Sequence, residues 1–388
     1  MMRVGVLFGG LSTEKEVSLN SGEYVCARLN RRKYEVVPIF QDSKARLWIL
    51  PRKLLTQNTT ADVEARLERE AQRIKYEDLK SLIDFAFIAL HGKYGDDGCI
   101  QGLLELLGIP YTGSGVLCSA ICMDKYMAHK ILAAEGIEVA REIAVSEKLW
   151  RSQPDLVIRM IKEEIGFPCV IKPNREGSSV GVNVVETEDQ IPAAMESMEI
   201  IEGTKDVRKG ALHHDTLVLV EEYLMGLEFS CIVLGNDNPK ALLPTEIIAC
   251  RHSSEPRLED RVFTYKKKYK PGGVEKRTPA RVTNATLRRI QDQVLKAYKV
   301  LGFENYGRID GYVVDGEWVK NDGDSPSQAE YVYEGKRVLI TDPNTSSGMG
   351  PGHLIYPQAA REGLRDSALL DRLIELALEA HSRKRGPL

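Results

Sequence analysis

The sequence has 388 residues, of which 43% are hydrophobic and 28% are charged, and its formal net charge at pH 7 is −3. These proportions are those of a globular protein with two or three domains, and the near-neutral charge argues against a nucleic-acid-binding protein, which normally has a basic surface. No apolar run approaches the roughly 20 residues that span a bilayer, and we recognise no signal peptide. We therefore expect a cytoplasmic protein that binds neither nucleic acid nor membranes.

The seven cysteines are scattered along the chain, mostly in apolar segments. Cys118 and Cys122 have the i, i+4 spacing of a helix, but no second Cys/His pair completes a zinc site. We interpret the cysteines as reduced thiols of the protein core.

The first predicted element is a buried strand at residues 4–8, followed by two glycines and a helix that Ser12 or Thr13 could cap. This order is typical of the first βαβ unit of an open α/β domain, whose ligands bind at the carboxyl ends of the strands. No GxGxxG motif is present, so a dinucleotide is not indicated. Glu14 could interact with the helix dipole, which is the commoner role, or bind a substrate ammonium group.

A second strand is predicted over residues 34–40, and the polar segment 41–81 is predicted to be helical and peripheral. A third buried strand, residues 85–90, ends at His91, which is followed by glycines. A histidine at the end of a strand is well placed to meet a ligand, although most isolated histidines are structural.

A short helix is predicted over residues 101–107, and the turn-rich segment 109–115 ends the first domain. We place the domains at residues 1–115, 116–224 and 225–388.

The stretch CVIKPNREGSSVG, residues 169–181, has the composition of a phosphate-binding loop. A short buried strand ends at Lys172, and the glycines and serines that follow can turn several backbone N–H groups toward one anion. A flexible hairpin with a surface lysine is the alternative. Upstream, a helix predicted over residues 123–135 carries Lys125 in its first turn.

Strands are predicted over residues 217–220 and 229–234, with an acidic segment between them. Backbone groups at a strand end suit an adenine and acidic side chains suit a ribose. This segment runs from Glu221 to Glu228.

The segment 262–273 is basic, aromatic and ends in glycines, so it is either a solvated loop or a lid that closes over phosphates. Apolar periodicity predicts amphipathic helices over residues 286–301 and 369–377. We expect the charged tail after the second helix to be frayed.

Hard oxygen ligands lie on two predicted neighbouring strands of the last domain. Asp310, Asp342 and Asn344 are of the type that Mg²⁺ prefers when it also holds phosphate oxygens. Strand alternation would place Arg308 on the same face as Asp310. A structural Arg–Asp pair is the alternative interpretation.

Six segments in this order resemble the ATP-grasp superfamily, and most closely the D-alanine–D-alanine ligase family: LFGGLSTEKEVSLNSG, IALHGKYGDDGCIQGLLELLGIPYTGSG, MDK, IKPNREGSSVG, YGRID and PNTSSGM. The resemblance covers nearly the whole chain. It implies the fold class α/β, with α+β architecture in the ATP-binding part. In this fold an open parallel α/β domain precedes two α+β domains that hold the nucleotide between them.

The resemblance also implies roles for individual residues. Nucleotide binding falls to Lys125, Lys172, Ser179, Glu221, Glu222, Leu224, Glu228 and Lys268. Two Mg²⁺ or Mn²⁺ ions would bind to Asp310, Asp342 and Asn344. Catalytic roles fall to Glu14, Ser178, Tyr269, Arg308 and Gly348, and contacts with substrates fall to His91 and His353.

The implied reaction is the ATP-dependent joining of two D-alanines through a D-alanyl phosphate, for the synthesis of peptidoglycan precursors by a homodimer. One alternative is a related ligase whose second substrate is another D-amino acid or a hydroxy acid such as D-lactate. A nucleotide-binding regulatory protein without turnover is an alternative of another class.

Three departures from the family pattern stand out. Asp342 occupies a position where the family usually has glutamate, and His353 follows the turn where the family usually has a serine. An extra segment between Asp310 and Asp342 predicts an additional hairpin at about 316–337. The lid carries Lys268 and Tyr269, where D-alanine–D-lactate ligases usually have a histidine, and this favours an amine as nucleophile.

Overall fold

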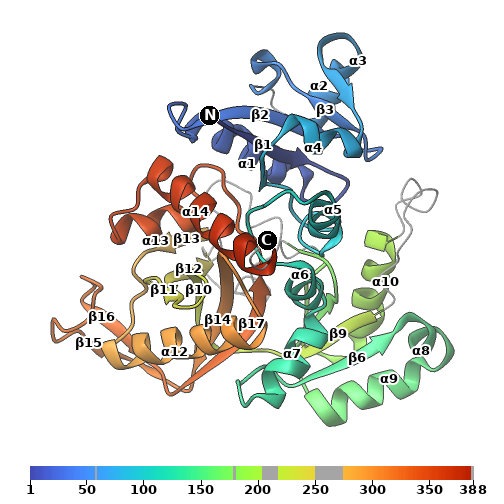
Figure 1. Ribbon diagram of the computed structural model, residues 1–388. Coiled ribbons are helices and arrows are strands. Elements are labelled where there is room, and N and C mark those ends of the chain that lie inside the picture. The colour runs from blue at the N-terminus through green and yellow to red at the C-terminus, as the bar shows by residue number, and fades with distance from the viewer. Residues whose placement is uncertain (57–58, 178–180, 203–216, 250–273, 386–388) are drawn as a thin grey trace.

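The computed structural model describes residues 1–56, 59–177, 181–202, 217–249 and 274–385. Three larger sheets with flanking helices follow one another along this part of the chain (Figure 1). The mixed α and β content agrees with the predicted fold class.

The first sheet has the strand order β4-β3-β2-β1-β5. Its strands are β1 (Met2–Gly9), β2 (Tyr34–Gln41), β3 (Leu47–Ile49), β4 (Gln72–Ile74) and β5 (Phe85–Ile88). β1 pairs in parallel with β2 and β5, whereas β3 and β4 are antiparallel to their neighbours. The predicted parallel sheet is therefore present at the centre, and the edge is antiparallel.

The prediction that residues 41–81 are helical is wrong for the two edge strands. Short helices do occur there, namely α2 (Thr60–Glu64), α3 (Leu67–Glu70) and α4 (Leu79–Leu82). Leu47 and Trp48 of β3 are buried, and the Trp48 ring nitrogen donates to Asp42 at 2.9 Å. Three-residue strands are too short for alternation to be recognised among charged residues.

Helix α1 (Lys15–Arg28) follows β1 through Gly9 and Gly10, whose φ angles of 92° and 100° favour glycine. The helix begins later than predicted, and the Ser12 hydroxyl accepts a hydrogen bond from the Glu14 N–H at 3.1 Å. Helix α5 (Cys99–Leu107) follows the loop after β5. This geometry brings the start of α1 close to the loop after β5.

The second sheet is antiparallel and has the order β6-β9-β7-β8. Its strands are β6 (Glu142–Ser146), β7 (Cys169–Pro173), β8 (Asn183–Val185) and β9 (Leu217–Glu222). A separate apolar cluster that includes Ile143, Ile171 and Val220 packs it against neighbouring helices. These helices are α8 (Glu147–Ser152), α9 (Pro154–Met160) and α10 (Ile191–Glu202).

The predicted helix at residues 123–135 corresponds to α7 (Lys125–Ala134), and a separate helix, α6 (Val116–Met123), precedes it. Asp124 separates them because its backbone is extended, with φ −92° and ψ 94°. Its carboxylate accepts a hydrogen bond from the Met127 N–H at 3.1 Å, which caps α7. This break places Lys125 at the first position of α7.

The third sheet has the order β13-β12-β10-β14-β17, with β11 (Lys240–Ala241) on β10. Its other strands are β10 (Gly226–Leu234), β12 (Thr245–Ala249), β13 (Val274–Arg277), β14 (Tyr306–Val314) and β17 (Arg337–Asn344). Helix α12 (Asn284–Val300) covers one face with buried residues such as Ile290 and Val294. The other face carries the polar side chains of the cleft described below.

Strands β15 (Glu317–Lys320) and β16 (Tyr331–Glu334) pair within the predicted extra segment. Trp318 packs edge-on against Tyr333 at 5.5 Å between ring centroids, and the Arg281 guanidinium lies 4.6 Å from the Trp318 ring centre. Arg281, which also pairs with Glu246 of β12, thus joins the hairpin to the third sheet.

The C-terminal helices are α13 (Ile355–Arg361) and α14 (Asp366–Arg385). The predicted frayed tail is wrong, because α14 continues well beyond residue 377. Lys384 near its end pairs with Glu304 at 2.7 Å, which anchors the last turns. No helix in the described part of the chain is long and apolar enough to cross a membrane.

Candidate active site

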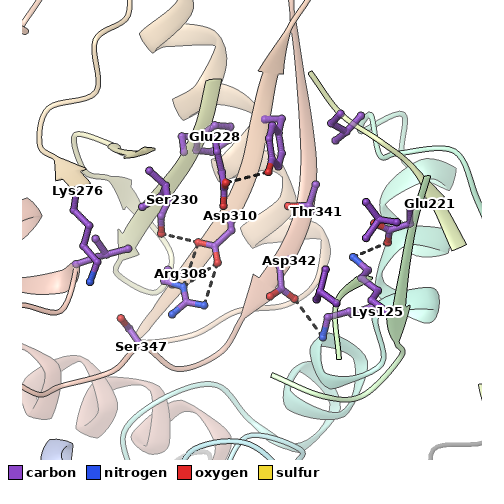
Figure 2. A pocket seen from close by; sticks show the side chains of 18 of the residues that line it. Lys125, Glu221, Glu228, Ser230, Lys276, Arg308, Asp310, Thr341, Asp342 and Ser347 are labelled. Atoms are coloured by element: carbon purple, nitrogen blue, oxygen red, sulfur yellow. Dashed lines mark hydrogen bonds and ion pairs between the residues drawn. The ribbon is translucent and has the colours of Figure 1, made fainter. Parts of the chain in front are cut away.

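A cavity of about 400 Å³ lies where the second and third sheets face each other (Figure 2). Its walls include Lys172 from β7, and Asp310 and Asp342 from β14 and β17. The sequence prediction requires these three distant residues to share one cleft, and they do. The cavity is therefore the candidate active site.

Two buried lysines face this cavity from the side of the second sheet. The Lys125 ammonium donates to the Glu176 carbonyl at 2.8 Å and lies 3.6 Å from the Asp342 carboxylate. The Lys172 ammonium is 2.7 Å from Glu221 Oε1. Both lysine residues are only 8% exposed, so their charges are available to a ligand inside the cleft and not to bulk solvent.

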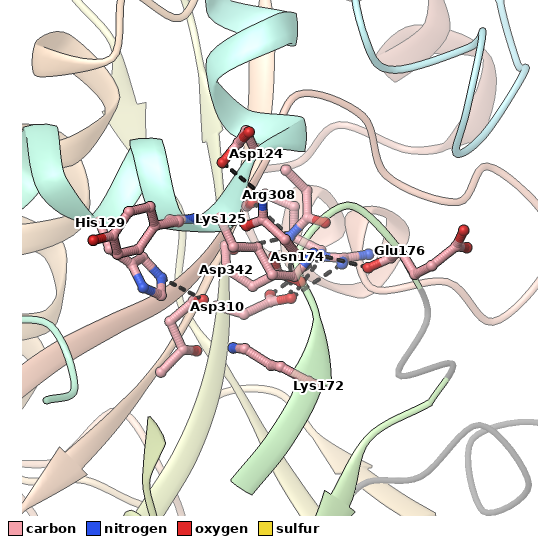
Figure 3. Close-up of polar contacts among 12 residues, drawn as sticks. Asp124, Lys125, His129, Lys172, Asn174, Glu176, Arg308, Asp310 and Asp342 are labelled. Carbon is pink, nitrogen blue, oxygen red and sulfur yellow. Dashed lines mark hydrogen bonds and ion pairs between the residues drawn. The ribbon is translucent and has the colours of Figure 1, made fainter. Parts of the chain in front are cut away.

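The loop after β7 is fastened to the start of α7 (Figure 3). The Asn174 amide donates to Asp124 at 2.8 Å, and its oxygen accepts from the Tyr126 N–H at 2.9 Å. Arg175 pairs with Asp124 at 2.7 Å. These contacts fix the direction in which the loop leaves the sheet, toward α1.

Gly177 in the same loop meets the carboxylate of Glu14, the residue that precedes α1. A Cβ atom at position 177 would lie 2.3 Å from Glu14 Oε2, a distance that real contacts do not reach. Only glycine fits this approach without a shift of the loop or of the glutamate. The candidate phosphate loop and Glu14 are therefore neighbours.

The acidic segment after β9 forms one wall of the cavity, as Leu224 and the three predicted glutamates all line it. Glu221 is buried and faces Lys172, whereas Glu222 pairs with Arg141 at 2.9 Å. The Tyr312 hydroxyl donates to Glu228 at 3.0 Å. This wall offers carboxylate and backbone groups beside apolar surface, which suits a nucleoside.

The predicted metal ligands lie together on one face of the third sheet. Asp310 of β14 stands directly opposite Asp342 of β17, and the Asn344 amide is 3.3 Å from Asp310 Oδ2. The Ser230 hydroxyl donates to Asp310 at 2.6 Å and orients it. Two carboxylates and one carboxamide on neighbouring strands fit the hard oxygen ligands that Mg²⁺ or Mn²⁺ requires.

Arg308 lies beside this acidic group, on the face predicted by strand alternation. Its Nη2 atom is 3.0 Å from Asp310 Oδ2. Burial lowers the pKa of Arg308, but Asp310 and then Asp342 raise it above its ordinary value. The guanidinium thus remains a fixed positive charge inside the cleft, next to the candidate metal ligands.

The turn after β17 brings Gly348 and His353 together. A Cβ atom at position 348 would lie 2.0 Å from His353 Nδ1, so any larger residue would displace the histidine ring. His353 lines the cavity, and Met349 beside Gly348 is fully buried. The sequence predicts both Gly348 and His353 as site residues, and the structure places them in contact.

Glu14 and His91 lie where the loops after β1 and β5 approach the segment after β17. His91 is within hydrogen-bond distance of the Ser21 and Ser346 hydroxyls, at 3.0 and 3.2 Å. Its ring therefore joins α1 to the loop after β17. Glu14 is partly buried and neighbours Gly92, where a Cβ atom would lie 3.0 Å from its carboxylate.

Asp96 is a second acidic residue at this junction, which the sequence analysis did not single out. Burial, and then the nearby Glu14 charge, raise the pKa of Asp96 to about 7. The Gly92 N–H donates to its carboxylate at 2.8 Å. Two neighbouring carboxylates form a natural subsite for a ligand cation.

A further polar cluster lies behind Lys172, where ligand atoms of His129, Glu142 and Glu221 come within 4.8 Å of one another. The two ring nitrogens of His129 are 2.8 Å from a Glu142 oxygen and 2.9 Å from the Thr341 carbonyl. Both ring nitrogens therefore already have partners within the protein. We interpret this cluster as a structural link between α7 and β17.

The structure thus places most of the predicted site residues in or beside one cleft. Four of them lie outside the described residues, namely Ser178, Ser179, Lys268 and Tyr269. The sequence analysis missed Asp96, Glu176 and Lys276. Asp96 stands in the glycine-rich segment after His91, so its position after a strand was a usable signal. Nothing in the sequence marked Lys276.

The comparisons with known proteins agree over nearly the whole chain. The family model described as D-ala D-ala ligase N-terminus matches residues 3–114, and the one described as D-ala D-ala ligase C-terminus matches residues 131–322. The chain is 36% identical over 378 residues to a D-alanine–D-alanine ligase of Desulforudis audaxviator, which covers 97% of this chain and 99% of the relative.

Solved structures are also similar to this one. The VanG D-Ala:D-Ser ligase of Enterococcus faecalis has a TM-score of 0.74 and 28% identity, covering 97% of this chain and 99% of the other. A D-alanine–D-alanine ligase of Bacillus anthracis complexed with ATP has a TM-score of 0.66 and 29% identity, covering 100% of both chains. These similarities extend across the cleft and all three sheets.

Proposed function

This chain belongs to the D-alanine–D-alanine ligase family, and from this premise we propose that it joins two D-alanines in the cleft between the second and third sheets. It is an ATP-dependent ligase with the ATP-grasp fold. The observation that carries the site assignment is the convergence of Lys172, Asp310 and Arg308 on one cavity. The product serves the synthesis of peptidoglycan precursors.

ATP would lie with its adenosine against the wall after β9, at Glu221, Glu222, Leu224 and Glu228, and with its phosphates at Lys125 and Lys172. In this structure Lys172 pairs with Glu221, and Lys125 lies beside Asp342. A bound triphosphate would offer both lysines a more highly charged partner. Ser179 and Lys268 are proposed nucleotide contacts on the sequence resemblance alone.

Asp310, Asp342 and Asn344 would hold two divalent cations, Mg²⁺ or Mn²⁺. Bound there, the ions would neutralise phosphate charge and orient the terminal phosphoryl group. The position of Lys125 next to Asp342 supports this assignment, because it puts a candidate phosphate ligand beside a candidate metal ligand. The aspartate at position 342 has a shorter reach than the usual glutamate, yet it supplies the same oxygens.

The first D-alanine would bind with its ammonium group between Glu14 and Asp96. Its carboxylate would then point toward Arg308, whose pKa the charge of Glu14 helps to raise. His91 would steady this subsite through its contacts with Ser21 and Ser346. Ser178 and Tyr269 are proposed to link Glu14 to the closing loop, again on the sequence resemblance alone.

The reaction would proceed in two steps. A carboxylate oxygen of the first D-alanine attacks the γ-phosphorus of ATP, and ADP leaves, which gives D-alanyl phosphate. The amine of the second D-alanine then attacks the acyl carbon, loses a proton and expels phosphate. Arg308 and the backbone N–H of Gly348 stabilise the negative charge that develops on the acyl oxygen.

The pH dependence of substrate binding follows from Asp96. Its pKa of about 7 means that Asp96 is protonated below neutrality and ionised above it. Because only the ionised form attracts the ammonium group, we expect KM for the first D-alanine to fall by up to about tenfold per pH unit as pH rises toward 7.

Steady-state kinetics between pH 6 and 8 measure this effect, and Asp96→Asn should flatten the profile and raise KM at pH 8. The amine of D-alanine stays protonated across this range and contributes no slope. If KM for the first D-alanine depends on pH in the variant as it does in the wild type, Asp96 is not part of the subsite.

A panel of substrates tests the proposed function. Phosphate release from ATP is measured with single D-amino acids and with pairs that include D-serine and D-lactate, and products are identified by mass spectrometry. We expect D-alanine alone to support release with formation of the dipeptide. If phosphate release requires a second substrate other than D-alanine, the ligase has a different specificity for its nucleophile. Nucleotide binding without any turnover would support a regulatory protein.

We place the domains at residues 1–115, 116–224 and 225–388, with the hairpin at about 316–337 as an addition to the last. We propose a homodimer that contacts through the first domain and works in the cytoplasm, without binding nucleic acid or membranes. Sedimentation of the purified protein distinguishes a dimer from a monomer.

A further inference from the structure

Lys276 is a cation at the edge of the third sheet that the reaction described above does not use. It lies on β13 opposite Ile247 of β12, which stands opposite Glu228 of β10. Glu228 in turn stands opposite Tyr312 of β14. Residues directly opposite each other in antiparallel strands share a face of the sheet. Lys276 is therefore on the face that carries the cleft, and it lines the cavity.

The position of Lys276 along the cleft is distinctive. Figure 2 shows it beyond Arg308, on the side away from Lys125 and Glu221. Burial, and next the charge of Arg308, lower the pKa of Lys276, which agrees with two cations facing the same space. The cleft thus has a nucleotide end at Glu221, a centre at Arg308 and a cationic far end at Lys276.

No ion pair joins Lys276 to another residue within the part of the chain that the structure describes. Its ammonium group makes a long contact of 3.5 Å with the Gly352 carbonyl. Arg308 and Lys172, by contrast, pair with the carboxylates of Asp310 and Glu221 at 3.0 and 2.7 Å. A second cation that faces the same space as Arg308 leaves room for an anion supplied by a ligand.

The chemistry of the second step identifies that anion. The phosphates of ATP belong to the lysines at the other end, and the acyl carbon of the first substrate is held at Arg308. The incoming amine must approach this carbon from the side of the cleft that lies away from the ATP phosphates. In an amino acid the carboxyl carbon is only about 2.5 Å from the amine nitrogen. The carboxylate of the nucleophile therefore enters the space that Lys276 faces.

We propose that Lys276 binds the α-carboxylate of the second D-alanine and so selects nucleophiles that carry a free carboxylate. The inference rests on the proposed function, because it needs a second amino acid as nucleophile. Gly352 would hold the lysine stem in place through its carbonyl, and His353 of the same turn would border the subsite. A four-carbon side chain lets the ammonium group follow the carboxylate as the amine attacks.

The test compares D-alanine with D-alaninamide as second substrate, with D-alanine filling the first site. The wild type should use the amide poorly, because the amide lacks the charge that Lys276 recognises. We expect Lys276→Gln to lower kcat/KM for D-alanine as nucleophile by about 10- to 100-fold through KM, and to leave the amide nearly unchanged. The preference for the free acid should shrink by the same factor.

Two further variants complete the experiment. Lys276→Arg should retain most of the preference, and Lys320→Gln, the same change on an exposed strand outside the cleft, should behave as wild type. KM for ATP and for the first D-alanine should stay constant in all variants. An equal loss for both nucleophiles, or no change, would overturn the role of Lys276. A wild type without D-alanine-dependent phosphate release would instead refute the proposed function.

Discussion

Arg308→Ala is expected to lower kcat at least about a hundredfold while affinity for ATP stays within about twofold. The guanidinium lies beside the candidate metal ligands and at the centre of the cleft, 3.0 Å from Asp310. There it can stabilise charge on the acyl oxygen, which develops only in the transition state. Such an interaction appears in kcat and not in ground-state binding of the nucleotide. Single-turnover product formation and ATP titration measure the two effects separately.

Two further variants separate the role of Arg308 from general damage. Arg308→Lys keeps a positive charge but loses the fork geometry, so it should recover only part of the activity. Arg337→Ala makes the same change at the exposed start of β17, where the side chain is 50% exposed, and should leave kcat unchanged. Normal turnover in Arg308→Ala would remove this residue from the oxyanion site.

Asp310→Asn should reduce turnover by about 10²- to 10³-fold and weaken the dependence of ATP affinity on Mg²⁺. The substitution keeps the shape of the side chain and the neighbouring Ser230 hydroxyl, but it removes one of the two carboxylates that face each other across β14 and β17. Fewer anionic oxygens hold a divalent cation less tightly. Turnover and nucleotide binding measured over a series of Mg²⁺ concentrations check this result.

The same experiment carries its own controls. Chelation of divalent cations should abolish turnover in the wild type, and either Mg²⁺ or Mn²⁺ should restore it. Asp315→Asn alters a carboxylate that is 56% exposed just after β14, and should have no effect. If Asp310→Asn keeps both full turnover and the wild-type response to Mg²⁺, Asp310 is not a metal ligand.

Sequence reasoning was most successful where function depends on short local patterns. Lys172 at the end of a buried strand, and Asp310 two residues after Arg308, were recognisable because alternation and turn residues act within a few positions. The same reasoning failed at β3, whose three residues carry too little pattern to identify a strand. It also ended α14 too early, because contacts such as the Lys384–Glu304 pair stabilise the last turns from outside the helix.

The sequence by itself determined the family, the order of the motifs and the chemical types gathered in the cleft, since these are written in adjacent residues. Only the tertiary structure decided that Asp96 opposes Glu14, that Gly177 meets the same glutamate, and that Lys276 faces the cavity. Each of these depends on strand register and on how one sheet sits against another. Such contacts join residues far apart in the chain, so no local periodicity encodes them.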